Sequence, residues 1–151
     1  MNNITFTLIA DTAEKRRIMI VCDDVFTISV IKRSNFEELF DKIDRNAAFI
    51  GAYTRKREIA GYCALYANDL IERTAYITLF CVRSQMQRMH VGSKLMDASI
   101  EEAASRGMNK IRLEVLKVDT GAIEFYKRNG FVITGCAADD SYYMERSIRE
   151  T

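Results

Sequence analysis

In the first third of the chain, apolar residues recur at the spacing of amphipathic helices. A short apolar run at 4–9 predicts a first strand. After it, Asp11 lies three residues before Glu14, which is typical of a helix start. A second helix is predicted from Ser34–Glu37, which has the form of a capping box. The apolar residues that mark the two buried faces are Ile18, Val21, Cys22 and Val25, then Phe36, Leu39, Phe40 and Ile43.

The middle of the chain changes to runs that are typical of strands. Residues 49–53 and 59–66 are mainly apolar, and the charged tip 54–58 joins them, which predicts an antiparallel hairpin. Residues 74–82, TAYITLFCV, form a longer and nearly continuous apolar run. Strands of this kind are usually covered on both faces, so we expect this one to be buried on both sides.

The second half alternates between strand and helix. Residues 91–106 suit a helix whose only polar stripe is Lys94, Asp97 and Glu101, so we expect most of its surface to be buried. The glycine after it ends the helix, and residues 110–116 form the next strand. A crossover of this length fits a right-handed parallel unit.

A short helix at 122–129 and two strands at 131–136 and 142–148 complete the pattern. No linker, internal repeat or low-complexity segment interrupts it. The predicted fold is therefore α/β, a single domain over residues 1–151 with a mixed sheet of about seven strands flanked by helices.

The composition narrows the class of protein. The chain has 151 residues, which fits one domain, and its 48% apolar and 28% charged residues are typical of a globular protein. A net charge of +1 lacks the basic excess of a nucleic-acid surface, so we expect no nucleic-acid partner. No run approaches the ~20 apolar residues of a membrane span. The first residues show neither the basic lead nor the apolar block of a signal peptide, which favours a cytoplasmic protein without a membrane partner.

Metal chemistry is not expected from these residues. The four cysteines, Cys22, Cys63, Cys81 and Cys136, are far apart, and no CxxC pair occurs. With His90 as the only histidine, the chain lacks the usual ligand set of a zinc site. We expect four reduced thiols and no metal.

The stretch QRMHVGSKLM, residues 87–96, joins the long apolar strand to the following helix. The start of a helix presents unpaired N–H groups and the positive end of its dipole, which together can bind an anion such as a phosphate. Gly92 allows a ligand to approach the backbone, and Ser93 adds a hydroxyl. One glycine at a helix start is more often just a turn, so the segment by itself is weak evidence for a phosphate site.

Two motif matches favour the phosphate interpretation over an ordinary turn. Residues 87–92 match the motif Gln/Arg-x-x-Gly-x-Gly/Ala except at His90. Downstream, residues at the right spacing match a second motif of the same family: Asp119, Ala122, Phe125, Tyr126, Gly130 and Phe131. The chain thus resembles the GNAT superfamily of acetyl-CoA-dependent N-acetyltransferases, in its order of elements throughout and in specific motifs over about residues 76–135.

The resemblance implies that acetyl-CoA is the cosubstrate. The pantetheine arm is expected to run as an extra strand along Phe80, Cys81 and Val82. The pyrophosphate is expected on the turn formed by Gln87, Arg88, Met89, His90, Val91, Gly92 and Ser93. Asp119, Phe125 and Tyr126 are also expected to contact the cofactor, although Asp119 replaces the family's asparagine and lacks its amide donor. His90 replaces a motif glycine and is strained if that position needs a positive φ.

The resemblance also implies catalytic roles. The N–H of Val82 is expected to stabilise the thioester oxygen, and Tyr126 matches the position of the general acid; packing under the sheet is its alternative role. Many relatives have a glutamate where this chain has Thr78, which cannot act as a base near neutral pH. Glu114 is the best remaining carboxylate, and a surface pair with Arg112 or another cation is its alternative role.

The function expected from these arguments is transfer of an acetyl group from acetyl-CoA to the amine of a small molecule, such as an amino sugar or amino acid, by direct attack. Two alternatives stay open. One is a non-catalytic acyl-CoA-binding or interaction module, because Thr78 and His90 depart from the family pattern. The other is a peptide or protein N-acetyltransferase. Dimers are common in the family, so a homodimer is one expectation, although the sequence leaves the oligomeric state open.

Overall fold

The structure is a computed structural model, and it describes residues 4–148. These residues form two compact units, and each is described by itself. The first contains residues up to 65 together with 79–99, and the second contains 66–78 together with the residues from 100 onward.

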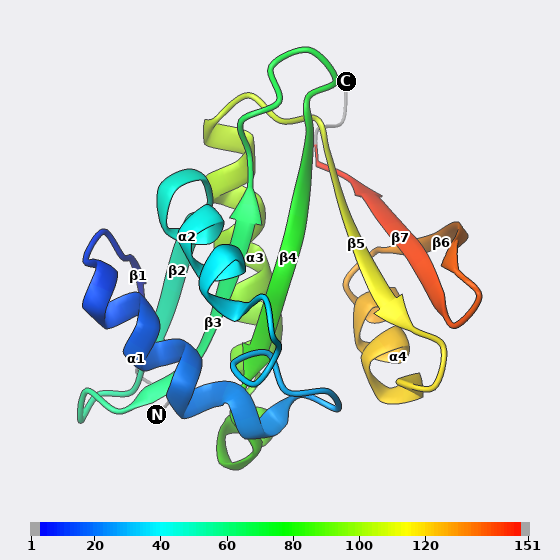
Figure 1. The fold of residues 1–151 in the computed structure, drawn as a ribbon. Coiled ribbons are helices and arrows are strands. Elements are labelled where there is room, and N and C mark those ends of the chain that lie inside the picture. Colours follow the sequence, from blue (N-terminus) through cyan, green and yellow to red (C-terminus); the bar gives the residue numbers. More distant parts are fainter. Residues whose placement is uncertain (1–3, 149–151) are drawn as a thin grey trace. The chain divides into compact units, whose positions relative to one another are not determined.

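Seven strands form one mixed sheet, in the order β1-β2-β3-β4-β5-β7-β6 (Figure 1). The strands are β1 (Thr5–Leu8), β2 (Ala48–Tyr53), β3 (Ile59–Tyr66), β4 (Thr74–Val82), β5 (Lys110–Leu116), β6 (Val132–Ala138) and β7 (Ser141–Ser147). The helices are α1 (Thr12–Cys22), α2 (Phe36–Asn46), α3 (Val91–Ser105) and α4 (Thr120–Arg128), with short 3-10 helices η1 (Asp23–Val25) and η2 (Ser84–Met89). The predicted class and the predicted elements are confirmed.

In the first unit, helices cover both faces of β2 and β3, which are buried along almost their whole length. Gly51 lies against the side chain of Ile18 in α1, where an added Cβ would come within 3.2 Å of it. The thiol of Cys63, on the other face, forms a hydrogen bond with Ser99 of α3. Helix α1 therefore packs on one face of these strands and α3 on the other, because Gly51 and Cys63 occupy alternate positions in register.

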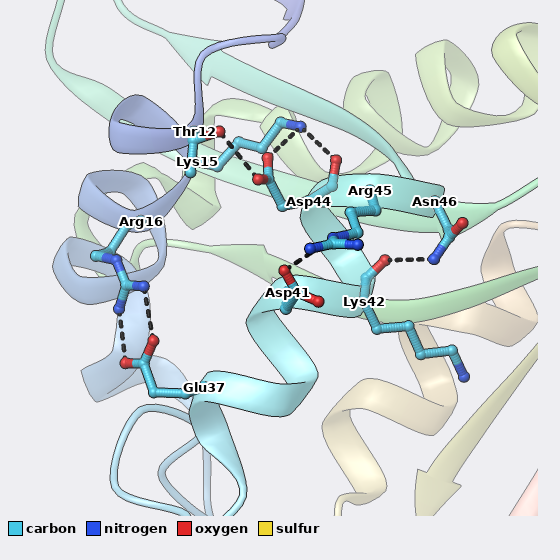
Figure 2. A network of polar contacts seen from close by, with 9 residues as sticks. All are labelled: Thr12, Lys15, Arg16, Glu37, Asp41, Lys42, Asp44, Arg45 and Asn46. Atoms are coloured by element: carbon cyan, nitrogen blue, oxygen red, sulfur yellow. Dashed lines mark hydrogen bonds and ion pairs between the residues drawn. The ribbon is translucent and has the colours of Figure 1, made fainter.

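Charged side chains join α1 to α2 (Figure 2). Lys15, although only 5% exposed, directs its ammonium to the carboxylate of Asp44 at 2.9 Å. Arg16 makes a two-pronged ion pair with Glu37, with its guanidinium 4.3 Å from the ring centre of Phe40. The two helices are thus held by one shielded ion pair and one arginine that is shared between a carboxylate and a ring.

The two predicted helix starts had different outcomes. The Asp11 carboxylate accepts the Glu14 N–H at 2.8 Å, so the first is confirmed. The capping box predicted at Ser34–Glu37 is wrong, because α2 begins after Asn35 without a side-chain cap. Glu37 binds Arg16 instead of the backbone, since a bidentate ion pair is the stronger use of its carboxylate.

The long helix α3 has the predicted distribution of polar residues. Lys94, Asp97 and Glu101 are exposed, whereas four apolar residues are fully buried and Ile100 is partly buried. The buried set is Val91, Leu95, Met96 and Ala103. Among the described residues, no helix has the length and apolar character needed to cross a membrane.

Strand β4 differs from the prediction. Only alternate residues are buried, and those between them, from Thr74 to Phe80, are partly exposed. The expectation that both faces are covered is therefore wrong for most of this strand. An apolar composition does not distinguish full coverage from a strand whose second face carries aromatic and hydroxyl groups, as Tyr76 and Thr78 do here.

The parallel pairing between β4 and β5 stops early. It runs from Thr74 opposite Lys110 to Ile77 opposite Leu113, and no later pair joins the described residues of these strands. Strand β4 nevertheless continues to Val82 and β5 to Leu116. The main-chain groups beyond Ile77 and Leu113 therefore have no partner in this ladder.

In the second unit, β7 lies between β5 and β6. Strand β6 is the edge of the sheet, and it exposes six of its seven residues. It carries no charged residue, and Val132 is 61% exposed. Its pairing with β7 shifts register twice, between Ile133 and Gly135 and between Cys136 and Ala138.

The ion pair between Lys15 and Asp44 generates a stability prediction. We expect Asp44→Asn to lower the free energy of unfolding by about 2 kcal/mol, because the shielded ammonium loses a charged hydrogen-bond partner. The hydrogen bond from Lys15 holds the pKa of Asp44 below its usual range, although burial opposes this. Stabilisation from a carboxylate of lowered pKa is present above the usual Asp range near ~4 and is lost as the pH falls through the folded-state pKa.

Urea unfolding of both proteins at several pH values measures this effect, and the difference should narrow below pH ~4. Asp41→Asn is the matched control, because it breaks an exposed pair with Arg45 on the same helix and should change stability by less than about 0.5 kcal/mol. Equal losses in the two variants would contradict the role assigned to Asp44.

Candidate active site

The end of β4 is anchored to α1. Within the predicted cofactor strand, Cys81 is buried, and its thiol donates to the carbonyl of Cys22 at 3.5 Å. The hydrogen bond with the Cys22 side chain, and after it burial, raise the pKa of Cys81. The thiol therefore stays protonated, and Cys81 contributes to the segment through its backbone rather than as a nucleophile.

Glycine brings β3 unusually close to the same segment. A Cβ at Gly61 would lie 2.3 Å from the carbonyl oxygen of Cys81 and 3.0 Å from the Cα of Val82. No side chain fits at that distance from a backbone, so the residue must be glycine. Close contact with β3 thus fixes the main chain of the segment that is predicted to bind the pantetheine arm.

The turn between β4 and α3 begins with the 3-10 helix η2. The side-chain amide of Gln87 folds back and donates to the carbonyl of Val82 at 3.1 Å. This bond ties the predicted phosphate turn to the predicted oxyanion donor residue. Arg88 and Met89 belong to η2, but their side chains lie outside the described part of the structure.

Helix α3 begins directly after His90. The Lys94 amide donates to the His90 carbonyl at 3.3 Å, so the amides of Val91, Gly92 and Ser93 form the first turn, where no intrahelical acceptor exists. His90 itself adopts φ 58° and ψ 22°, which is the left-handed region. The glycine position of the motif therefore requires a positive φ, and histidine occupies it with strain.

Thr78, at the family's usual base position, and the candidate base Glu114 occupy equivalent places in the second unit. Thr78 is the first residue of β4 after the ladder ends, and Glu114 is the first residue of β5 after it. Glu114 is exposed, and its carboxylate accepts the hydroxyl of buried Ser141 at 2.6 Å. The alternative reading of Glu114 as a partner of Arg112 is wrong, because the Arg112 guanidinium binds Glu145 at 2.7 Å.

Tyr126 lies in an aromatic cluster of the second unit. Its ring meets Phe125 and Phe131 edge to face, with ring centres 5.5 and 5.8 Å apart. The Tyr126 carbonyl also accepts the Phe131 N–H at 3.0 Å. Packing accounts for the ring and leaves the hydroxyl as the group that the predicted catalytic role requires.

Asp119 occupies the N-cap position of α4, but its side chain makes no capping bond. Its backbone carbonyl instead accepts the Ile123 N–H at 3.0 Å. The residue thus begins the helix through its main chain.

The predicted residues divide between the two units. The cofactor segment from Phe80 to Ser93 belongs to the first, whereas Glu114, Asp119, Phe125 and Tyr126 belong to the second. Within the first unit, the strand end and the turn are joined by the bond between Gln87 and Val82.

Sequence analysis missed the role of Asp23. This residue is 8% exposed, and its carboxylate accepts the Ser29 hydroxyl at 2.6 Å and the Val30 and Ile31 amides at 2.8 and 3.1 Å. Burial, the largest single influence, raises the pKa of Asp23, but these hydrogen bonds together outweigh it and the pKa is lowered. The loop after η1 is therefore shaped by one carboxylate, and the acidic pair Asp23-Asp24 was the only signal for it in the sequence.

Comparison with known proteins identifies the class. A sequence model of the acetyltransferase (GNAT) family matches residues 19–131. The chain belongs to this family, and it is an acetyltransferase of the acetyl-CoA-dependent type.

Solved structures agree with this assignment. Ard1 from Thermoplasma volcanium is 25% identical, with a TM-score of 0.79 and coverage of 97% of this chain and 99% of that one. PaiA N-acetyltransferase from Thermoplasma acidophilum, solved with coenzyme A, is 17% identical, with a TM-score of 0.80 and coverage of 96% and 99%. Nourseothricin acetyltransferase is 26% identical, with a TM-score of 0.64 and coverage of 70% and 68%.

The left-handed conformation of His90 generates a prediction about the phosphate turn. We expect His90→Gly and His90→Asn to unfold at or above the temperature of the unmodified protein, because both residues tolerate a positive φ. His90→Val should lose about 1–2 kcal/mol, since a β-branched side chain is excluded there.

Thermal unfolding ranks the three variants, and calorimetric titration with coenzyme A should show tighter binding for His90→Gly than for His90→Val. A valine variant as stable as the glycine variant would mean that residue 90 does not hold the left-handed conformation.

Proposed function

We propose that the chain transfers the acetyl group of acetyl-CoA to the amine of a small molecule of the amino-sugar or amino-acid type. The observation that carries this proposal is the early end of the β4–β5 ladder, because an extended ligand with its own amide groups can pair with a strand where its neighbour in the sheet no longer does. Family membership supports the choice of acetyl-CoA. The likeness to nourseothricin acetyltransferase supports a small-molecule acceptor.

The described residues suit coenzyme A. Its pantetheine arm has alternating amide groups, which match the main chain of Phe80, Cys81 and Val82 as another strand would. Its pyrophosphate needs N–H donors, and the first turn of α3 supplies those of Val91, Gly92 and Ser93. The Gln87 amide holds the intervening turn against Val82.

The reaction requires a neutral amine nitrogen to attack the thioester carbon. A C–N bond forms, the carbonyl oxygen gains negative charge, and the C–S bond then breaks. We assign the Val82 N–H as the donor to that oxygen, since a fixed backbone donor needs no reorganisation as the charge develops.

We assign to Tyr126 the role of hydrogen-bond donor to the leaving sulfur. A tyrosine has a pKa near ~10 and a thiol one near ~8.5, so complete proton transfer costs about 2 kcal/mol. We therefore infer that the Tyr126 hydroxyl mainly donates a hydrogen bond to the sulfur. The aromatic contacts with Phe125 and Phe131 hold the ring while it does so.

The amine proton is assigned to Glu114, directly or through water. Deprotonating a lysine-like amine at pH 7 costs about 4.6 kcal/mol, whereas an α-amino-like amine costs only about 1.4 kcal/mol. With Thr78 at the position of the usual base, an acceptor of low pKa is favoured. The hydroxyl of Ser141 orients the Glu114 carboxylate.

A peptide or protein N-terminus is the second candidate acceptor. The likeness to Ard1 over almost the whole chain favours it, and an α-amine also has a low pKa. A non-catalytic coenzyme A-binding module is the remaining alternative.

One set of assays separates these functions. Calorimetry with coenzyme A tests binding, and release of free thiol from acetyl-CoA is then screened over amino sugars, amino acids and short peptides. We expect turnover with the small amines. Turnover confined to peptides would support the second candidate, binding without turnover would support a non-catalytic module, and absence of binding would contradict the whole proposal.

Tyr126→Phe tests the leaving-group role. We expect kcat to fall roughly 10- to 100-fold, because the ring packing is kept and only the donor is lost. The affinity for acetyl-CoA should stay within about twofold. Steady-state kinetics and calorimetry measure the two quantities, and unchanged kcat would remove Tyr126 from the chemistry.

Glu114→Gln tests the proton acceptor. We expect kcat/KM for the amine to fall roughly 100-fold near pH 7 and to recover toward that of the unmodified enzyme as the pH rises, since solvent then supplies the neutral amine. Ser141→Ala is the control that perturbs only the orientation of the carboxylate, and its loss should be smaller. A loss in Glu114→Gln that is the same at every pH would exclude Glu114 from proton transfer.

A further inference from the structure

One face of the second unit gathers aromatic and charged groups that the proposed reaction does not yet use. On β5, Arg112 and Glu114 alternate with buried Ile111, Leu113 and Val115 and so lie on the opposite, more exposed face. The antiparallel register sets Tyr143 opposite Glu114 and Glu145 opposite Arg112. The parallel register sets Tyr76 of β4 beside Arg112. Three strands therefore contribute to one surface.

The positive charges on this face are already paired. Arg112 donates to Glu145 at 2.7 Å, and Lys110 lies 3.6 Å from the same carboxylate. The Arg112 guanidinium also lies 5.1 Å from the ring centre of Tyr143, which holds that ring on the face that carries Arg112. Glu145, only 14% exposed at its side chain, thus serves both cations.

Glu114 is different, because no ion pair within residues 4–148 includes it. Its carboxylate is exposed, and its one assigned hydrogen bond comes from the buried hydroxyl of Ser141. Burial, and then the charge of Glu114, raises the pKa of Tyr76, so this half-buried phenol stays neutral beside the carboxylate. Glu114 thus shares one face of the sheet with Tyr143, which is opposite it in register, and with Tyr76, whose pKa it influences. A carboxylate outside any ion pair and two tyrosine rings on one face are suited to a cation, because ring faces and carboxylate all attract positive charge.

We propose that Glu114, Tyr76 and Tyr143 bind the protonated amine of the acceptor, so that the enzyme prefers cationic acceptors over neutral analogues. This proposal rests on the proposed function and deepens it: the two rings select the ammonium form, and Glu114 then takes its proton. The place of Glu114, at the first position of β5 beyond the ladder, puts this recognition at the point where the strands stop pairing.

The test compares removal of a ring with removal of its hydroxyl. We expect Tyr76→Leu and Tyr143→Leu each to raise KM for the amine about threefold to tenfold, which is the range of one cation–π contact. Tyr76→Phe and Tyr143→Phe should retain the KM of the unmodified enzyme. KM for acetyl-CoA should be unchanged in all four.

Tyr142→Leu is the matched control. Tyr142 is the neighbour of Tyr143 on the opposite face of β7, and it also has a cation over its ring, with the Lys117 ammonium 5.1 Å from the ring centre. Its loss should leave the amine KM unchanged, provided that circular dichroism shows all variants folded. A rise in KM equal to that of Tyr143→Leu would mean that the effect is structural, and the proposal would be overturned.

A binding measurement keeps this proposal separate from the enzymatic one. NMR titration of the unmodified chain should show stronger binding of glucosamine than of neutral N-acetylglucosamine, and the two leucine variants should abolish that preference. Preference that survives both leucine substitutions would overturn the cation site. Preference that disappears in them without any turnover of acetyl-CoA would uphold the site and reject the proposed function.

Discussion

The structure depends on the parallel ladder between β4 and β5, which is shorter than either strand. Backbone N–H and C=O groups are rarely left without partners inside a protein, yet β4 and β5 pair only as far as Ile77 and Leu113. The remaining residues of both strands keep extended backbone without each other's hydrogen bonds. Under the proposed function, the pantetheine arm of acetyl-CoA, which is extended and has its own amide groups, pairs with the end of β4.

Other contacts fix the end of β4 and the turn after it. Gly61 lets the backbone of β3 press against Cys81, the thiol of Cys81 binds the end of α1, and the Gln87 amide closes the turn onto Val82. Each contact acts on main-chain atoms rather than on a reactive side chain. Within the first unit these contacts hold the backbone of the predicted cofactor segment in place, whereas the predicted groups Glu114 and Tyr126 belong to the second unit.

Much of this organisation was predictable because it is local in sequence. The polar stripe of α3, the hairpin of β2 and β3 and the Asp11 cap all follow from spacing, and the structure has them. The capping box predicted at Ser34–Glu37 is wrong because Glu37 forms an ion pair with Arg16, a residue 21 positions away. The register between distant strands likewise sets where the β4–β5 ladder ends, and it places Tyr76, Glu114 and Tyr143 on one face. No local pattern in the sequence determines that register.

The outer strand β6 has a consequence for the behaviour of the chain in concentrated solution. An uncharged, exposed outer strand can template the addition of further strands from other molecules, which begins aggregation. Its two register shifts bend and twist the strand, and bent strands accept flat neighbours poorly. The irregular backbone of β6 thus protects against aggregation, as lysine or proline on the edge strand does in many other proteins.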